Sequence, residues 1–200
     1  LAINNMAHCT LGDGRLLRVY ANSGSTTWNV QVGTATNGSV TWGSSYTVPS
    51  TYSYLMCVTA CHTSNFVLAF CNNLYGSSNV TVFTIAGLVN GSNVVSFGAV
   101  YNNSSGGVFQ QFTIGDMSQG GTTAFFNFSF LLGATSGSTS YTQIYGFNIT
   151  TLTIGTSTGQ LVATDLGISV SGQSLCLVRY GTYNFMLIGI NALNTTQCRC

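Results

Sequence analysis

The chain has 200 residues, of which only four Arg and three Asp carry a formal charge, giving a net charge of +1. A charged fraction of 4%, against about 25% in typical soluble domains, excludes a basic surface for nucleic acid, and 45% hydrophobic residues exclude a disordered chain. No apolar run approaches the roughly 20 residues of a spanning helix, so we expect no membrane span. With 24 Gly and one Pro, the composition predicts an all-β protein rich in turns.

Three segments of the chain match one another: 15–48, 65–101 and 123–161. Each opens with an apolar strand (16–20, 66–70, 124–128) and continues, after a turn, with a second strand (28–32, 80–84, 141–145). Each then reaches a third strand with a shared triplet: Thr41-Trp42-Gly43, Ser96-Phe97-Gly98 and Thr153-Ile154-Gly155. A further strand is expected before each unit, at 5–10, 54–60, 108–114 and 174–179.

Four antiparallel strands repeated every 50–60 residues or so are typical of a β-propeller blade. The sequence thus predicts one all-β repeat domain over 1–200, an array of four-stranded antiparallel blades at roughly 1–50, 51–104 and 105–163 with a partial blade at 164–200. The last unit shows its first two strands (174–179 and 184–190) and lacks the outer two, which gives about three and a half blades and fourteen strands. Such an incomplete blade would expose a strand edge that invites pairing with another chain.

The segment 12–20 (GDGRLLRVY), continuing to Thr27-Trp28, resembles the blade repeat of sialidase-type propellers, in which a turn and a strand lead into an Asp-box ending in Thr-Trp. The resemblance covers one blade, and Ser23 and Ser25 stand where the box would carry its Asp and Gly. It implies the blade fold alone. The family's arginine triad, Tyr/Glu pair and acid Asp cannot be placed in a chain with four Arg and no Glu. We therefore expect no catalytic residue, cofactor or metal site.

The cysteines predict disulfides in an oxidising compartment, and hence a secreted or extracellular protein. Cys57 and Cys71 are expected on adjacent strands and nearly opposite each other, as a candidate cross-strand pair. Cys198 or Cys200 could reach Cys9, or one of the two could bond a neighbouring molecule. The seven candidates are Cys9, Cys57, Cys61, Cys71, Cys176, Cys198 and Cys200.

The Asn-x-Ser/Thr acceptor pattern for N-linked glycans occurs in turns that are equivalent in the repeat. Asn37, Asn90 and Asn148 all precede the shared triplet. Further candidates are Asn79 and, in predicted loops, Asn102, Asn103 and Asn194. Asn127 also fits the pattern but stands within a predicted strand, which makes it the least suitable.

The two tryptophans receive different predictions. Trp42 aligns with Phe97 and Ile154 and is expected in the core. Trp28 has no such counterpart and is the candidate for stacking on a sugar ring.

These features favour an extracellular structural glycoprotein subunit that self-assembles through its incomplete blade into a fibre or surface layer. Its expected partners are copies of itself and its own N-linked glycans. The alternative is a carbohydrate-binding, lectin-like propeller that uses Trp28. An enzyme of sialidase-like descent comes third, because the catalytic residues are missing.

Overall fold

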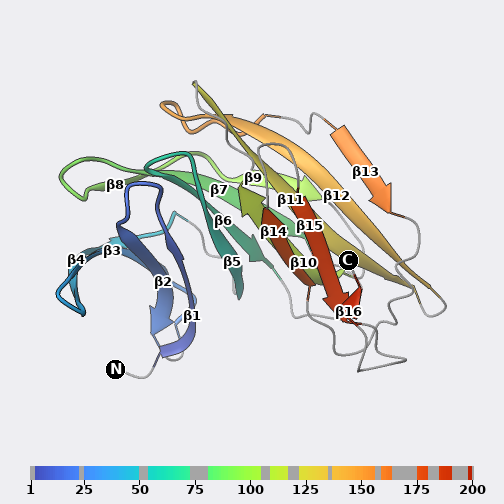
Figure 1. Cartoon of the computed structure of the whole chain (residues 1–200), viewed down its shortest axis with the longest axis horizontal. Helices are drawn as coiled ribbons and strands as arrows, with labels where there is room; N and C mark the ends of the chain where they lie inside the picture. Colours follow the sequence, from blue (N-terminus) through green and yellow to red (C-terminus); the bar gives the residue numbers. More distant parts are fainter. Residues whose placement is uncertain are drawn as a thin grey trace.

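The computed structural model of the chain describes residues 3–22, 25–49, 54–72, 81–104, 109–116, 122–134, 137–155, 159–163, 175–179, 185–190 and 198–199. All sixteen elements within these ranges are β-strands, and all pair in antiparallel fashion, so the predicted all-β, antiparallel class is confirmed (Figure 1). The described ranges contain no helix with the length and hydropathy needed to cross a membrane.

Four sheets are built from consecutive strands. The first sheet holds β1 (Ile3–Thr10), β2 (Leu16–Asn22), β3 (Trp28–Thr36) and β4 (Ser39–Thr47). The second holds β5 (Tyr54–Cys61), β6 (Asn65–Cys71), β7 (Val82–Val89), β8 (Val95–Phe97) and β9 (Tyr101–Ser104). The third holds β10 (Phe109–Asp116), β11 (Thr123–Ala134), β12 (Gly137–Asn148) and β13 (Gly159–Ala163), and the fourth β14 (Leu175–Arg179), β15 (Phe185–Ile190) and β16 (Cys198–Arg199).

The fourth sheet corrects the strand count made from the sequence. The prediction that this unit lacks both outer strands is wrong, because β16 pairs with β15 through Ile190↔Cys198 and Gly189↔Arg199. A strand of two residues is too short to show an alternation of apolar and polar residues, so β16 could not be predicted from the sequence pattern.

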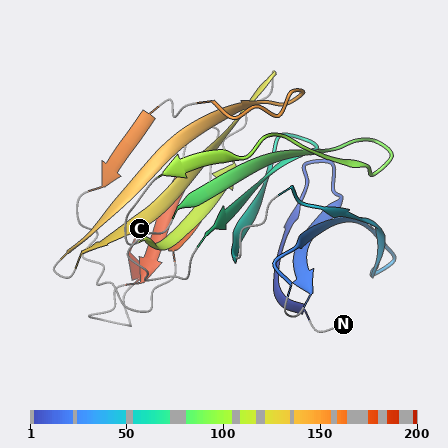
Figure 2. The ribbon, with the colours of Figure 1, turned by 180° about the vertical axis from the view of Figure 1, so that it is seen from behind.

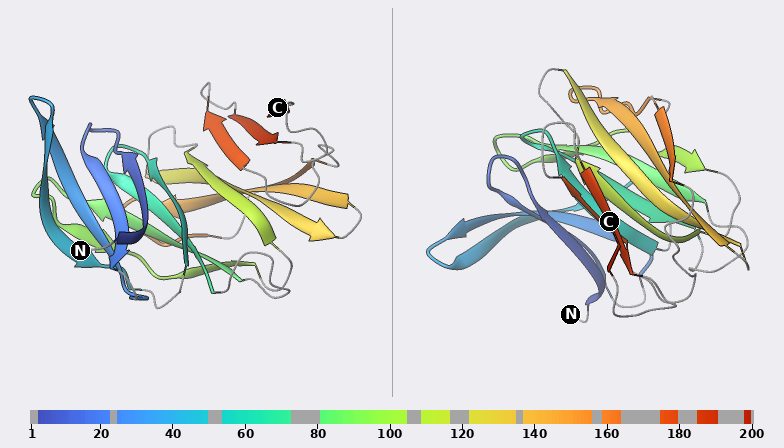
Figure 3. Two further views of the ribbon diagram at one scale, coloured as in Figure 1. Left: turned by 90° about the horizontal axis from the view of Figure 1, so that it is seen from below. Right: turned by 45° about the vertical axis from the view of Figure 1, so that its right-hand side comes forward.

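The sheets follow one another in chain order, because their first strands are neighbours: β1 lies beside β5, β5 beside β10, and β10 beside β14. Figures 1 and 2 show the resulting fan from opposite sides, and Figure 3 shows the first sheet at one end of it. The described strands form this succession of stacked sheets, and no closed ring of blades is seen among them.

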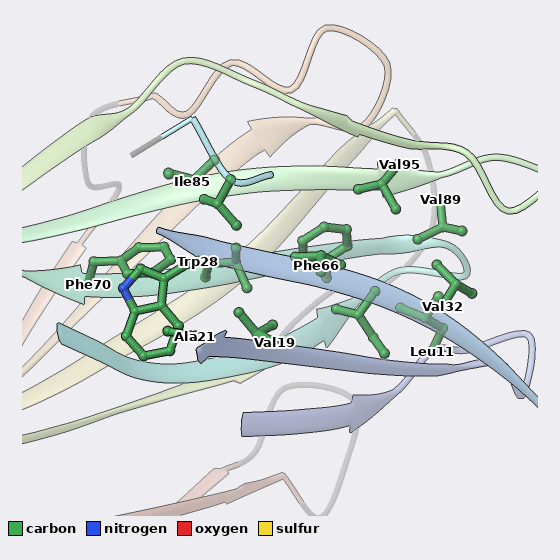
Figure 4. Close-up of a cluster of buried hydrophobic side chains, with 14 residues drawn as sticks. Leu11, Val19, Ala21, Trp28, Val32, Phe66, Phe70, Ile85, Val89 and Val95 are labelled. Atoms are coloured by element: carbon green, nitrogen blue, oxygen red, sulfur yellow. The ribbon is translucent and has the colours of Figure 1, made fainter. Parts of the chain in front are cut away.

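The first and second sheets share one hydrophobic core (Figure 4). Alternate residues of β2 and β3, such as Val19 and Trp28, meet Phe66 and Phe70 of β6. The Trp28 ring lies 6.0 Å from the Phe70 ring at a tilt of 58°. Burial of each large side chain in such a core contributes about 1.5–3 kcal/mol to the free energy of folding.

A second core joins the second sheet to the third, and β6 supplies both cores. Its odd-numbered residues, Val67, Ala69 and Cys71, pack with Phe126 and Phe147 of the third sheet. Its even-numbered residues face the first sheet. This burial on both faces explains the unbroken apolar run at 66–70.

The shared triplet marks a break in the outer strand of each sheet. Its central residue pairs across the sheet in all three cases: Gly33↔Trp42, Gly87↔Phe97 and Phe147↔Ile154. Beyond the triplet, the pairing register of the outer strand shifts in the first sheet. In the second sheet β8 ends and a separate strand, β9, pairs with β7. In the third sheet Ile154 forms an isolated bridge, and β13 begins only after it. The strand predicted at 153–155 is therefore an isolated bridge.

In the second and third sheets, one pair of cross-strand neighbours contains a single large ring. The ring belongs to a different strand of the pair in each sheet. Phe66 of β6 lies opposite Gly87 of β7, and a Cβ atom added to Gly87 would overlap the Phe66 ring. In the third sheet the same pair is Ala124 opposite Phe147. The same paired position therefore holds a large side chain on β6 in the second sheet and on β12 in the third.

Candidate functional site

One face of the first sheet points away from the second sheet, and it lies at the end of the stack (Figure 3). Along β2 and over residues 28–32 of β3, the residues between the buried ones are only half-buried. β4 adds residues beyond the register shift, including Val40, whose side chain is 39% exposed. We call this set the outward face: Leu16, Arg18, Tyr20, Asn29, Gln31, Val40, Trp42, Ser45 and Thr47.

The outward face differs in chemistry from the same face of the other sheets. Arg18 pairs with Gln31, whereas the equivalent pairs are Leu68↔Ile85 in the second sheet and Phe126↔Tyr145 in the third. Those two apolar pairs are buried against the preceding sheet. The polar pair on the first sheet therefore suits contact with water or a ligand better than contact with another apolar sheet.

Trp42 lies on this face in a space that a glycine provides. An added Cβ atom at Gly33 would come within 2.9 Å of two carbons of the indole ring, so only glycine leaves room for the ring there. The Arg18 guanidinium lies over the ring, with Cζ 4.1 Å from the ring centroid, and 5.3 Å from the centroid of Tyr20. A guanidinium held over an indole is a favourable cation–π contact.

Hydrogen bonds between side chains hold this arrangement in place. Gln31 Oε1 accepts from Arg18 Nε at 2.9 Å and from Nη2 at 2.5 Å, and Gln31 Nε2 donates to the Gly43 carbonyl at 2.9 Å. Tyr20 Oη and Ser45 Oγ are hydrogen-bonded at 3.1 Å. The aromatic and cationic groups are thus fixed before any ligand arrives, which lowers the entropic cost of binding.

Among the described residues, no acidic side chain pairs with Arg18. The sequence contains no Asp or Glu between Asp13 and Asp116. Asp13 is committed to Arg15, at 2.6 Å. Within the described part of the chain, Arg18 Nη1 donates no hydrogen bond, since Gln31 engages only Nε and Nη2.

Arg15 and Asp13 form a separate cluster that joins the first two sheets. Arg15 Nη1 donates to the Asn90 carbonyl at 2.6 Å, and Nη2 donates to the Val89 carbonyl at 3.1 Å. Hydrogen bonds from Arg15 and Ser64 hold the pKa of Asp13 below its ordinary value of 3.8. We call this cluster the Arg15 clasp. At the equivalent position of the second sheet, buried Asn65 donates to the Ile149 carbonyl of the third sheet at 3.0 Å.

The structure places both tryptophans differently from the prediction. Trp28, the predicted sugar-stacking residue, is only 2% exposed in the core against Phe70, so its ring is not accessible to a ligand. Trp42, predicted in the core, aligns with Phe97 and Ile154 as expected, but it is only half-buried, because none of the described strands packs over this face of the first sheet. Sequence analysis also missed Arg18 and Gln31, although a charged residue at a position that is apolar in the other repeats was a usable sign.

The described cysteines do not match the predicted pairing. Cys57 lies opposite Ala69 and Cys71 opposite Tyr54, because the register shifts between Leu55 and Cys57. Cys9, the candidate partner of Cys198 or Cys200, is a free thiol whose pKa is raised by burial to about 12. Cys176 lies in β14 and Cys198 in β16, and Cys200 lies outside the described residues.

Three of the predicted glycan acceptors occupy equivalent exposed turns. Asn37 lies in the β3–β4 turn with a φ of 51°, Asn90 directly follows β7, and Asn148 is the last residue of β12. Asn90 Oδ1 accepts from the amides of Ser92 and Val94, and Asn148 Oδ1 from those of Thr150 and Thr151, all at 2.9 Å. The Nδ2 atoms of these two residues, to which a glycan would be attached, make no hydrogen bond within the described part of the chain.

The other acceptors are less favourably placed or undescribed. Asn102 and Asn103, expected in a loop, lie in β9. Asn127 lies in β11, paired on both sides with Gly115 and Ile144. Asn79 and Asn194 lie outside the described residues.

We expect glycans at the three turns when the chain is secreted from a eukaryotic host. The variants Ser39→Ala, Ser92→Ala and Thr150→Ala each destroy one acceptor pattern and keep the Asn side chain, so each should lower the intact mass by one glycan. Asn127 provides the internal control, because a central strand is a poor acceptor, and it should carry none. A secreted chain with the mass of the bare polypeptide would contradict this prediction.

Across the described residues, no group of three or more His, Cys, Asp or Glu side chains is arranged to hold a metal ion. The polar and aromatic cluster of the outward face is therefore the candidate site, and its groups are suited to binding. Comparisons with protein-family models, with curated proteins and with solved structures found no match to this chain.

Proposed function

We propose that this chain is an extracellular carbohydrate-binding module, with its sheets arranged as propeller-like blades and its binding site on the outward face. A single observation carries the proposal: Arg18 is stacked over Trp42, whereas the residues at the position of Arg18 in the second and third sheets, Leu68 and Phe126, are apolar and buried. Tyr, Trp and Arg are the side chains that contribute most binding energy at recognition surfaces.

The neighbouring groups suit a sugar in particular. The apolar faces of a sugar ring pack against aromatic or planar groups, and its hydroxyls need donors and acceptors beside them. The outward face offers Trp42 and Tyr20 together with the hydroxyl and amide groups of Asn29, Gln31 and Ser45. A sheet face at the end of the stack fits an extended polysaccharide better than a small enclosed molecule.

A glycan array probed with the purified chain tests the proposal. We expect saturable binding to at least one class of glycan, and a Trp42→Ala variant should bind it at least about tenfold more weakly, a loss of about 1.4 kcal/mol. The matched control is Val94→Ala, which removes an exposed apolar side chain from the connection between β7 and β8. Wild-type protein that binds no glycan, or a Trp42→Ala variant that binds like the control, would refute the proposal.

The self-assembling structural subunit stays a prediction. It depended on a fourth unit without outer strands, and β16 supplies one of them. The polar outward face also gives little apolar area for stacking a further sheet. Light scattering over a range of protein concentrations decides between a polymer and a discrete species.

A further inference from the structure

We infer that the outward face selects acidic polysaccharides, through a carboxylate or sulfate group bound by Arg18. This inference rests on the proposed function and names the class of sugar that the site would take. It follows from the position of a half-buried cation that has no anionic partner among the residues that the structure describes.

The available donors of Arg18 define what the ligand must supply. Gln31 engages Nε and Nη2 through one neutral oxygen, so both N–H bonds of Nη1 lack an acceptor in the described part of the chain. Asp13 cannot serve, because its Oδ2 already accepts from Arg15 and Ser64. An oxyanion is the acceptor that a guanidinium binds most strongly, and carboxylate and sulfate groups can each accept two parallel hydrogen bonds.

The aromatic neighbours then decide the kind of molecule that carries the anion. Trp42 lies under the guanidinium and Tyr20 beside it, so a ligand bound at Nη1 must lie along an aromatic surface. A free inorganic anion would gain nothing from these rings. A sugar ring bearing the anion would contact the rings and the guanidinium together.

Binding to three polymers tests the inference: polygalacturonate for the carboxylate, dextran sulfate for the sulfate, and uncharged dextran as the reference. We expect at least one acidic polymer to bind about tenfold or more tightly than dextran. Arg18→Gln should abolish this preference, while Arg18→Lys, which keeps the charge and loses the planar pair of donors, should retain only part of it. The two acidic polymers show which oxyanion is preferred.

Arg199→Gln is the matched control, because it removes the same charge from β16 in the fourth sheet. It should bind like the wild type, and a fall equal to that of Arg18→Gln would indicate attraction by net charge alone and overturn the inference. Equal binding of all three polymers by the wild type would also overturn it and leave carbohydrate binding intact. If the wild type binds none of the polymers and no glycan on the array, the proposed function fails as well.

Discussion

Moving the large ring from residue 66 to residue 87 should restore most of the stability that each single substitution removes. Phe66→Ala empties part of the first core and should cost about 3–5 kcal/mol of unfolding free energy. Gly87→Phe places a ring where Phe66 already lies and should prevent folding, and the smaller Gly87→Ala should cost about 1–3 kcal/mol. The double variant Phe66→Ala/Gly87→Phe reproduces the Ala124 and Phe147 pair of the third sheet. We therefore expect it to fold.

Urea unfolding followed by fluorescence measures this exchange, because Trp28 is buried in the same core and reports on it. The control combines Gly87→Phe with Leu68→Ala. Leu68 pairs with Ile85 and leaves no space opposite residue 87, so this variant should gain nothing from the second change. A Phe66→Ala/Gly87→Phe variant no more stable than the control would show that the second sheet cannot accept the ring arrangement of the third sheet.

Arg15→Ala should lower the free energy of unfolding by about 1–3 kcal/mol, because two backbone carbonyl groups of the neighbouring sheet lose a charged donor. The Arg15 side chain is only 16% exposed and donates to the carbonyls of Val89 and Asn90 in the second sheet. Arg18→Ala is the control, since it removes the same charge from the outward face and bridges no sheets. It should cost less than about 1 kcal/mol. Equal losses in chemical denaturation would mean that the Arg15 clasp does not hold the sheets together.

The same clasp should make stability depend on pH in the acidic range. The pKa of Asp13 is lowered, chiefly by its hydrogen bond with Arg15, so the ionised carboxylate stabilises the fold above the ordinary value of 3.8. This contribution is lost as the pH falls through the lower, folded-state pKa. Asp13→Asn should therefore show a flatter stability profile between about pH 5 and pH 2 than the wild type. Stability profiles of the wild type and Asp13→Asn that run parallel over this pH range would contradict the prediction.

The repeat was the most informative part of the sequence. Aligning 16–20 with 66–70 and 124–128 places residues of the same sheet face in register, as the pairs Leu68↔Ile85 and Phe126↔Tyr145 show. The second repeat strand was less well aligned: Trp28 was set against residue 80, whereas the pairs Ala21↔Trp28 and Cys71↔Val82 make Val82 its counterpart. A shift of two residues keeps every side chain on its own face. In the third repeat Trp28 was set against residue 141, whereas the pair Ser129↔Thr142 makes Thr142 its counterpart, and this shift of one residue places the side chains on the opposite face.

The candidate site was harder to predict, because exposure depends on what covers a sheet and not on the strand itself. Trp42 has the strand position of Phe97 and Ile154, and it differs from them only in belonging to the sheet at the end of the stack. Trp28 could have been assigned to the core, because it stands two residues before Val30 and the residues on either side of Val30 are polar. Arg18 and Gln31 become neighbours only through the pairing of β2 with β3.

The interruption that follows each shared triplet also bears on solubility. A chain with so few charges cannot rely on the Lys and Glu side chains that usually keep sheet edges apart. Its outer strands are instead kinked or split, by the register shift opposite Gln31 and Gly33 and by the division into β8 and β9. An edge broken in this way offers no long row of amides and carbonyls as a template for fibrillar aggregation.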